Sequence, residues 1–243
     1  MSDVMTEVSV LSRQQSKTEF GRGLRASLPV MFGFIPFALV LGAQANQKGL
    51  SVIEVPLLTG LNFAGGSEFT AISLWTSPPH ILLIVAMSIL VNSRHLLMGA
   101  ALTPYIAHLS KKKALGMLFF MCDECWAMGL ADAKTRQSKN LILPYFFGVS
   151  FGLYSTWVIF TTIGAMLGPI IGDVEVYGFD MAFTAVFLVL LKGMWKGAVA
   201  CRPWFVSLIV ACVTYLLIPG AWYVAAGAIA GVLSSILWSK RCD

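Results

Sequence analysis

Charged side chains are scarce in this chain. Asp, Glu, Lys and Arg make up 12% of its 243 residues, whereas hydrophobic residues make up 57%. A soluble domain carries about 25% charged residues. Apolar runs of 18 residues or more recur along the sequence, and a helix needs about 20 residues to span a bilayer. The sequence therefore predicts an all-α polytopic membrane protein with room for six to eight segments and no soluble catalytic domain.

Other absences narrow the function. A Gly-x-x-x-x-Gly-Lys-Ser/Thr nucleotide-binding sequence does not occur, and no basic patch with interleaved aromatic residues suggests nucleic acid. The polar first twenty residues lack the pattern of a signal peptide. The net charge of +5 is explained by Lys and Arg in short cytoplasmic loops. We expect no nucleic-acid partner, no cofactor and no enzyme activity.

The sequence has five cysteines, which are Cys122, Cys125, Cys201, Cys212 and Cys242. An odd number, with three members inside apolar runs, predicts free buried thiols. Cys122 and Cys125 have the C-x-x-C spacing of zinc and redox sites. No second cysteine pair and no His at ligand spacing accompany them, and their flanks are apolar, so a metal or redox site is disfavoured.

Eight apolar segments are predicted, at 24–45, 52–75, 81–106, 114–131, 141–171, 179–191, 204–218 and 221–238. No composition shift divides them, so we expect a cytoplasmic N-terminal tail at 1–23 and a single transmembrane transport domain at 24–239. Basic residues before the first segment and after the last predict that both termini are cytoplasmic.

Two of these segments are predicted to turn back within the membrane. Lysines at 111–113 precede the segment at 114–131, and Lys134, Arg136 and Lys139 follow it. A full crossing would leave one basic cluster outside, against the positive-inside rule. The segment at 52–75 contains Gly65-Gly66, a pair that breaks helices. The expected fold has six full spans and two re-entrant or broken segments, with eight full spans as the alternative.

Five ionisable residues lie inside these segments, namely Glu68, Arg94, His95, Asp123 and Glu124. A charge at the centre of a membrane helix costs about 2.5 to 3.5 kcal/mol on translocon-based scales. Each of these residues therefore needs a partner, a water-filled cavity or a function.

The first candidate site comprises Gly65, Gly66, Ser67 and Glu68. Glycines before a new helical turn leave backbone N–H groups free at the positive end of a helix, where broken transporter helices hold a substrate carboxylate. The alternative is a glycine-rich kink that Glu68 merely caps.

The second candidate site comprises Asn92, Arg94 and His95. Arg94 is always charged and needs an anion, which Glu68, Asp123, Glu124 or a substrate carboxylate can supply. A permanent structural ion pair is equally compatible with the sequence. His95 is a candidate proton relay, although a helical His is more often a structural hydrogen-bonding residue.

The third candidate site is Asp123-Glu124. Adjacent carboxylates in a low-dielectric environment do not both ionise easily, so one of them can exchange a proton during transport. A pair of Asp180 and Asp123 would suggest an intramembrane aspartyl protease, but the Gly-x-Gly-Asp motif of such enzymes is absent.

In this order the motifs resemble the AzlC family, the large subunit of bacterial branched-chain amino-acid exporters, over roughly 23–238. The residues that carry the resemblance are Ser27-Leu28-Pro29, Ile35-Pro36-Phe37, Phe63-Ala64-Gly65-Gly66-Ser67-Glu68-Phe69, Asn92-Ser93-Arg94-His95-Leu96-Leu97-Met98-Gly99, Cys122-Asp123-Glu124, Gly178-Phe179-Asp180 and Ala185-Val186-Phe187. One departure is Glu68, where the family usually has Gln.

The resemblance implies proton-driven export of valine, leucine, isoleucine or methionine across the bacterial cytoplasmic membrane. It also implies a small hydrophobic AzlD-like membrane subunit as partner. Gly65 to Ser67, with Arg94, would hold the substrate carboxylate, and Glu68 or Asp123 would bind its ammonium group. Asn92 is a further candidate substrate-binding residue. His95, Asp123 or Glu124 would carry the proton. A non-transporting membrane scaffold and a passive channel are the alternatives.

Overall fold

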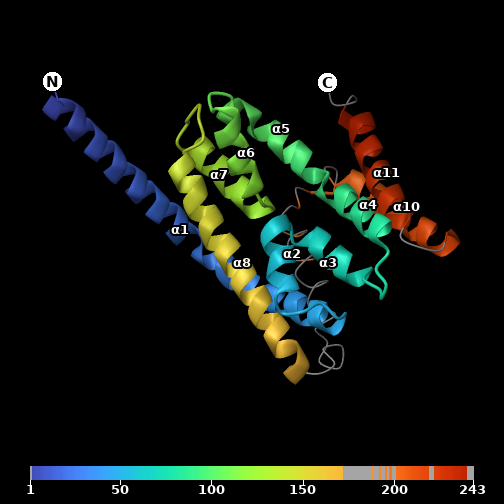
Figure 1. Ribbon diagram of the computed structural model, residues 1–243. Coiled ribbons are helices and arrows are strands. Elements are labelled where there is room, and N and C mark those ends of the chain that lie inside the picture. The colour runs from blue at the N-terminus through green and yellow to red at the C-terminus, as the bar shows by residue number, and fades with distance from the viewer. Residues whose placement is uncertain are drawn as a thin grey trace. The chain divides into compact units, whose positions relative to one another are not determined.

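The computed structural model describes residues 2–171, 201–218 and 222–239, together with Leu188, Lys192, Trp195, Gly197 and Ala198. These residues form helices and no strand (Figure 1). The helices are α1 (Ser2–Gln47), α2 (Glu54–Asn62), α3 (Gly66–Ser73), α4 (Ile81–Asn92), α5 (Arg94–Ile106), α6 (Lys111–Phe119), α7 (Asp123–Thr135), α8 (Leu143–Ile171), α10 (Arg202–Leu217) and α11 (Trp222–Ser239). The predicted all-α class is thus confirmed for this part of the chain.

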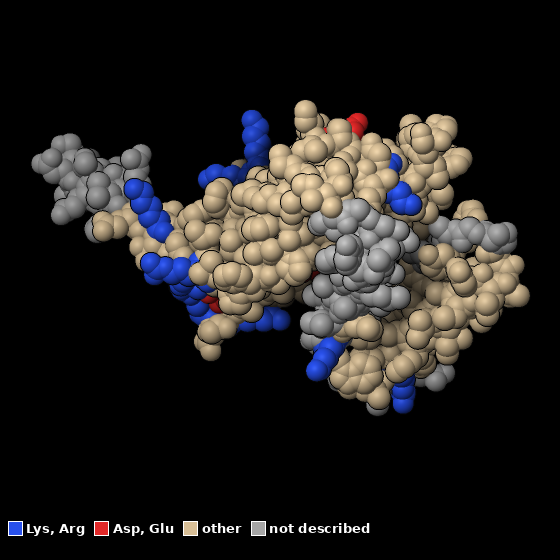
Figure 2. Space-filling view, turned by 90° about the horizontal axis from the view of Figure 1, so that it is seen from below, with Lys and Arg blue, Asp and Glu red and all other residues tan. Residues whose placement is uncertain are grey.

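Three described stretches are long and apolar enough to span a membrane, Gln14–Gln47, Ile81–Ile106 and Leu143–Ile170. α10 is a shorter apolar helix, and so is the part of α11 at Ala226–Trp238. The predicted segment at 179–191, with Asp180, lies outside the described residues apart from Leu188. The chain forms two compact units, Met1–Phe183 and Thr184–Asp243. Most of the described surface in Figure 2 carries no charged side chain.

α1 and α8 pack along each other to form the core of the first unit. A Cβ atom at Gly23 would lie 2.1 Å from the Tyr145 carbonyl oxygen, and one at Gly42 would lie 1.9 Å from that of Thr161. The backbones therefore touch where small residues allow it, which is how membrane helices associate closely. Because Gly23 faces Tyr145 and Gly42 faces Thr161, the two helices run in the same direction.

α1 is longer than the sequence predicted. It begins at Ser2 rather than near residue 24, and it continues uninterrupted through Pro29 and Pro36, although a proline inside a helix can kink or break it. The N-terminal tail at 1–23 is therefore helical from Ser2 onward. Once the apolar part of α1 is formed, each added residue of the tail costs little, because helix propagation gains one hydrogen bond per residue.

A network of four charged side chains attaches the C-terminal part of α7 to α1. The Arg22 guanidinium donates to both carboxylate oxygens of Asp132, at 2.7 and 3.0 Å, and to Glu19 at 2.7 Å. Arg136 lies 3.2 Å from Glu19 and 3.4 Å from Asp132. Arg22 also lies over the Tyr145 ring, 3.9 Å from its centroid. Two carboxylates and two guanidinium groups thus satisfy one another at this end of α7.

The segment at 52–75 is an interrupted helix. α2 ends at Asn62, and Phe63 adopts the left-handed conformation with a φ of 45°. Gly65 has a φ of 46°, and α3 begins at Gly66. The sequence predicted a break at the glycine pair; the break lies at residues 63–65, and only its last residue belongs to that pair. α3 then runs toward the start of α4 (Figure 1).

The segment at 114–131 is interrupted as well, between α6 and α7. The end of α5 and the start of α8 meet, because the Leu141 N–H donates to the Tyr105 carbonyl at 3.0 Å. The start of α7 instead lies beside the start of α5, where Asp123 contacts Arg94. α6 therefore leads away from the end of α5, and α7 returns the chain to it. Lys111 to Lys113 and the basic residues after α7 lie at the same end of this hairpin.

In the second unit, α10 and α11 pack through small residues. A Cβ atom at Gly227 would lie 2.9 Å from the Ala211 Cβ, and one at Gly231 would lie 3.1 Å from the Ser207 Cβ. The Tyr215 and Tyr223 rings make an edge contact with centroids 5.4 Å apart. This unit carries no candidate site residue.

Candidate functional site

The break between α2 and α3 is fixed by the carboxylate of Glu68. One carboxylate oxygen accepts the Ala64 N–H at 2.9 Å, and the other accepts the indole N–H of Trp157 on α8 at 2.7 Å. The side chain is fully buried, with 0% exposure. A buried carboxylate is tolerated when its oxygens are hydrogen-bonded. Glu68 therefore holds the first turn of α3 against both the break and α8.

Arg94, the first residue of α5, links the two interrupted helices. One of its terminal nitrogens donates to the Ala64 carbonyl oxygen at 3.0 Å, within the α2–α3 break. The other forms an ion pair of 2.8 Å with Asp123, the first residue of α7. Of the anions that the sequence offered to Arg94, the structure pairs it with Asp123. Glu68 and Arg94 both bind the backbone of Ala64, Glu68 through its N–H and Arg94 through its carbonyl oxygen.

A chain of amide groups runs beside this link. The Asn62 side-chain amide donates to the Ser67 hydroxyl at 2.8 Å, and that of Asn92 donates to the Asn62 side-chain oxygen at 3.2 Å. His95 lies next to it, with Nδ1 3.2 Å from the Asn92 backbone oxygen. Side chains from α2, α3, α4 and α5 are thus joined in one polar cluster.

Three buried polar atoms of this cluster have no hydrogen-bond partner among the described residues. They are the side-chain oxygen Oδ1 of Asn92, Nε of Arg94 and Oδ1 of Asp123. The Arg94 and Asp123 side chains as wholes remain 34% and 40% exposed. Leaving a buried polar atom unpaired costs about 1 to 3 kcal/mol. One donor and two acceptors of this cluster are therefore left without a partner among the described residues.

Aromatic side chains surround the break. Phe37 stacks on Phe69, with ring centroids 4.6 Å apart, and also contacts Trp157. On the other side, the Phe63 ring meets the Tyr154 ring at 5.1 Å, and the Tyr154 hydroxyl donates to the Gly60 carbonyl at 2.8 Å. These rings give the polar cluster apolar walls, in which charge interactions are stronger than in water.

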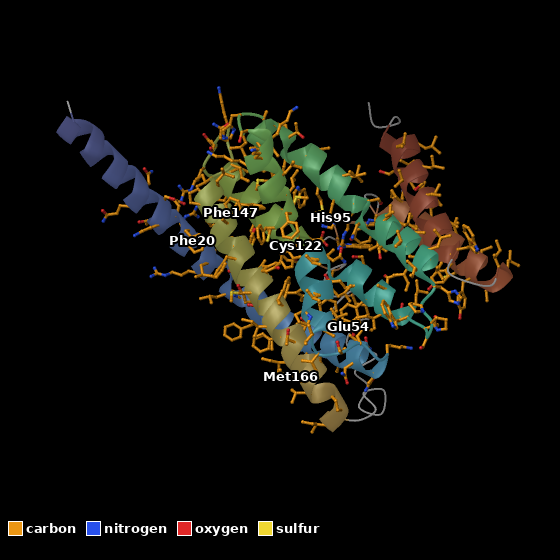
Figure 3. The ribbon with its side chains drawn as sticks, in the orientation of Figure 1. Phe20, Glu54, His95, Cys122, Phe147 and Met166 are labelled. Carbon is orange, nitrogen blue, oxygen red and sulfur yellow. The ribbon has the colours of Figure 1, made fainter. Side chains whose placement is uncertain are left out.

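Most of the sequence-predicted residues gather here. Gly65, Gly66 and Ser67 form the start of α3, and Asn92, Arg94, His95 and Asp123 are joined to it by the contacts above. Glu124 follows Asp123 in the first turn of α7. Figure 3 shows His95 and Cys122 in the central region of this unit. Glu54 lies at the start of α2, the end that is farther from the break.

Sequence reasoning missed four contributors, namely Ala64, Asn62, Tyr154 and Trp157. Ala64 acts only through its backbone, and no sequence signal identifies such a role. Asn62 was detectable as an amide inside an apolar segment. Trp157 and Tyr154 carry polar groups that need partners when buried, although the sequence does not indicate which partners they find.

Three apolar stretches long enough to span a membrane, together with two interrupted helices beside a buried polar cluster, define a helical membrane protein. A sequence profile of the family described as AzlC protein matches residues 29–171. This chain therefore belongs to the AzlC family.

Several curated proteins are similar to the chain. A membrane protein of Archaeoglobus fulgidus, described as uncharacterized, is 30% identical over 184 residues, covering 73% of this chain and 77% of the relative. Inner membrane protein YgaZ of Escherichia coli K12 is 28% identical over 61% of each chain. Branched-chain amino acid transport protein AzlC of Bacillus subtilis is 26% identical over 75% of this chain and 70% of its own length. No solved structure matches the chain.

Proposed function

We propose that this chain is a secondary exporter of hydrophobic amino acids such as valine, leucine, isoleucine and methionine, located in the bacterial cytoplasmic membrane. Two observations support the proposal. The Bacillus subtilis relative is named as a branched-chain amino acid transport protein. The observation that carries most weight is the set of three unpaired atoms, one donor and two acceptors, beside the break between α2 and α3.

An amino-acid zwitterion complements these three atoms. Its carboxylate accepts from Arg94 Nε and from the backbone N–H groups at the start of α3, where the helix dipole favours an anion. Its ammonium group donates to the unpaired oxygens of Asn92 and Asp123. Between the two candidates for this role, Asp123 is favoured over Glu68, because both Glu68 oxygens already accept hydrogen bonds. The aromatic walls then contact the apolar side chain.

Proton coupling is assigned to Asp123, with Glu124 and His95 as neighbouring groups. Protonation of Asp123 removes the negative charge to which the substrate ammonium group would donate. A proton and a substrate thus compete for the same carboxylate. Such competition is a simple physical basis for coupling transport to the proton gradient.

A small AzlD-like membrane subunit is the proposed partner, as membership of the AzlC family suggests. The stretch at Ile81–Ile106 is the candidate span with the least protein around it, since 6% of its apolar window is buried, against 39% for Gln14–Gln47 and 50% for Leu143–Ile170. This stretch also carries Arg94. A partner that covers it would shield the ion pair from lipid.

For the topology we propose that 52–75 and 114–131 are re-entrant and that both termini are cytoplasmic. The hydrogen bond between Leu141 and Tyr105 supports this arrangement for the α6–α7 hairpin. Single cysteines introduced by Lys112→Cys and Lys134→Cys, in a background without other cysteines, test it. Both should react with an impermeant maleimide from the cytoplasmic side only. Labelling from opposite sides of the membrane would contradict the hairpin.

The transport proposal is tested in vesicles that contain the chain and its partner and are loaded with labelled leucine. Efflux should saturate, respond to the sign of the pH gradient and be inhibited by valine, isoleucine and methionine. Arg94→Gln should lower the rate at least 100-fold, and Arg94→Lys, which keeps the charge but loses the fork geometry, should retain part of it. Absence of efflux under both signs of gradient would favour a scaffold, and non-saturating flux would favour a channel.

A further inference from the structure

Two thiols meet at the start of α7. The sulfur atoms of Cys122 and Cys125 lie 3.1 Å apart, and both residues are free cysteines with exposed fractions of 7% and 0%. Cys122 is the residue that precedes α7, and Cys125 lies in its first turn. Disulfide oxidoreductases place their C-x-x-C thiols in this way at a helix N-terminus. Apolar flanks argued against a redox site in the sequence, whereas the short sulfur–sulfur distance argues for one.

The same helical turn carries the carboxylate of the candidate site. Asp123 lies between the two cysteines in the sequence and pairs with Arg94 at 2.8 Å. Its side chain is 40% exposed, so a small polar molecule that reaches Asp123 is within one helical turn of the sulfur atoms. A change at the thiols therefore acts on the geometry of the ion pair without crossing any other element.

We propose that Cys122 and Cys125 form a redox-active dithiol that is energetically coupled to the Arg94–Asp123 ion pair and that reacts with low-molecular-weight disulfides. One cysteine thiolate attacks the disulfide and releases the first thiolate. The second cysteine attacks the mixed disulfide and releases the second. The protein loses two protons and two electrons and gains one sulfur–sulfur bond, and the oxidant becomes two thiols.

The new bond joins the residue before α7 to the third residue of the helix, and so it immobilises the turn that carries Asp123. Oxidation then restricts the movement by which the carboxylate leaves Arg94 for a substrate ammonium group. This last consequence, slower transport, rests on the proposed function. The thiol chemistry and its coupling to the ion pair do not.

Coupling between two sites is reciprocal, so removing the ion pair must change the dithiol–disulfide equilibrium. The test uses purified full-length protein carrying Cys201→Ser, Cys212→Ser and Cys242→Ser. This protein is equilibrated with glutathione buffers of increasing oxidised fraction, acid-quenched, unfolded and alkylated with a maleimide, and its free thiols are counted by mass spectrometry. We expect conversion from two free thiols to none, at a defined glutathione ratio.

In the same background, Asp123→Asn and Arg94→Gln should each shift the equilibrium constant at least threefold. Glu54→Gln, at the far end of α2, is the matched control and should leave it unchanged. The proposal is overturned if both thiols remain alkylatable in fully oxidised glutathione. An unchanged constant in both ion-pair variants would equally overturn the coupling.

Transport gives a separate readout. Oxidised protein should export leucine at least fivefold more slowly, with recovery after reduction, and Cys125→Ser should make the rate insensitive to the oxidant. A disulfide that forms without slowing transport contradicts the proposed consequence for the ion pair. Failure of the reduced protein to transport would instead contradict the proposed function, while the thiol equilibria would still decide the inference.

Discussion

Both interrupted helices of the first unit contact Arg94, but the carboxylates beside the two breaks have different surroundings. At the α2–α3 break, the Glu68 carboxylate is fully buried and both its oxygens accept hydrogen bonds. At the α6–α7 break, the Asp123 side chain is 40% exposed, with one oxygen on Arg94 and the other buried and without a partner among the described residues. Two acidic residues at helix starts thus face opposite environments.

From this difference we infer that Glu68 has a positioning role and that Asp123 is the carboxylate that exchanges partners. Glu68 accepts the Ala64 N–H, and the Ala64 carbonyl, which belongs to the next peptide group, accepts from Arg94. A fully satisfied buried carboxylate has nothing to offer a ligand unless the fold opens. Asp123 holds Arg94 directly and keeps an oxygen available. In the proposed mechanism, the α2–α3 break is therefore the fixed wall of the site, and the α6–α7 break provides the group that changes partner.

The largest expected effect distinguishes the two carboxylates. Asp123→Asn should lower the leucine efflux rate at least 100-fold, because the amide neither titrates nor pairs with Arg94. Glu68→Gln should stay within fivefold of the unmodified protein, since the amide oxygen still accepts the Ala64 N–H. Both rates are measured in vesicles at matched protein amounts. An equal loss in both variants, or the reverse order, would show that the two breaks do not differ in the proposed way.

The sequence predicted the parts of the molecule that this comparison involves, but not the contrast between them. Scarce charges and apolar runs predicted the helical membrane class, and Gly65-Gly66 predicted an interruption near the right position. The basic residues on both sides of 114–131 predicted that this segment is re-entrant, which stays a prediction. Arg94 was expected to need an anion. These predictions rest on local composition and on the cost of burying charge, and both can be judged from the sequence alone.

The details that decide the roles were not predictable. Trp157 is 89 residues from Glu68, and an apolar helix gives no sign of which acceptor its indole will meet. The Ala64 contact with Arg94 uses a backbone carbonyl, which every residue has. Nothing in the sequence therefore shows that Asp123 rather than Glu68 pairs with Arg94. Three-dimensional packing alone assigns one carboxylate to the wall and leaves the other accessible.

A smaller effect is expected when the fixed wall is weakened. Trp157→Phe removes the indole N–H and leaves a buried Glu68 oxygen unpaired, at a cost of about 1 to 3 kcal/mol of stability. Because this substitution also removes packing, the same change is made in a Glu68→Gln background, and the difference isolates the hydrogen bond. Thermal unfolding in detergent measures all four proteins. Additive effects would mean that the indole–carboxylate contact contributes nothing to the wall.

The smallest effects are expected from substitutions of one glycine in each interrupted helix. Gly65 has a φ of 46°, and a Cβ atom there would meet only the Trp157 ring, at 3.9 Å, and the Phe37 ring, at 4.0 Å. Gly65→Ala therefore introduces backbone strain without a steric clash, and it should lower stability by about 1 to 2 kcal/mol. Gly116, inside α6, has open space around its added Cβ, so Gly116→Ala should raise stability by about 0.5 to 1 kcal/mol.

Thermal unfolding of these two variants compares the shape of the α2–α3 break with the regular helix that leads into the other break. Opposite signs are the expected result, because alanine suits a helix interior and does not suit the conformation that Gly65 adopts. If Gly65→Ala were neutral, the break would have relaxed into an ordinary turn. Ala64 would then no longer be held against Arg94, and the fixed wall would lose the geometry that distinguishes it from the start of α7.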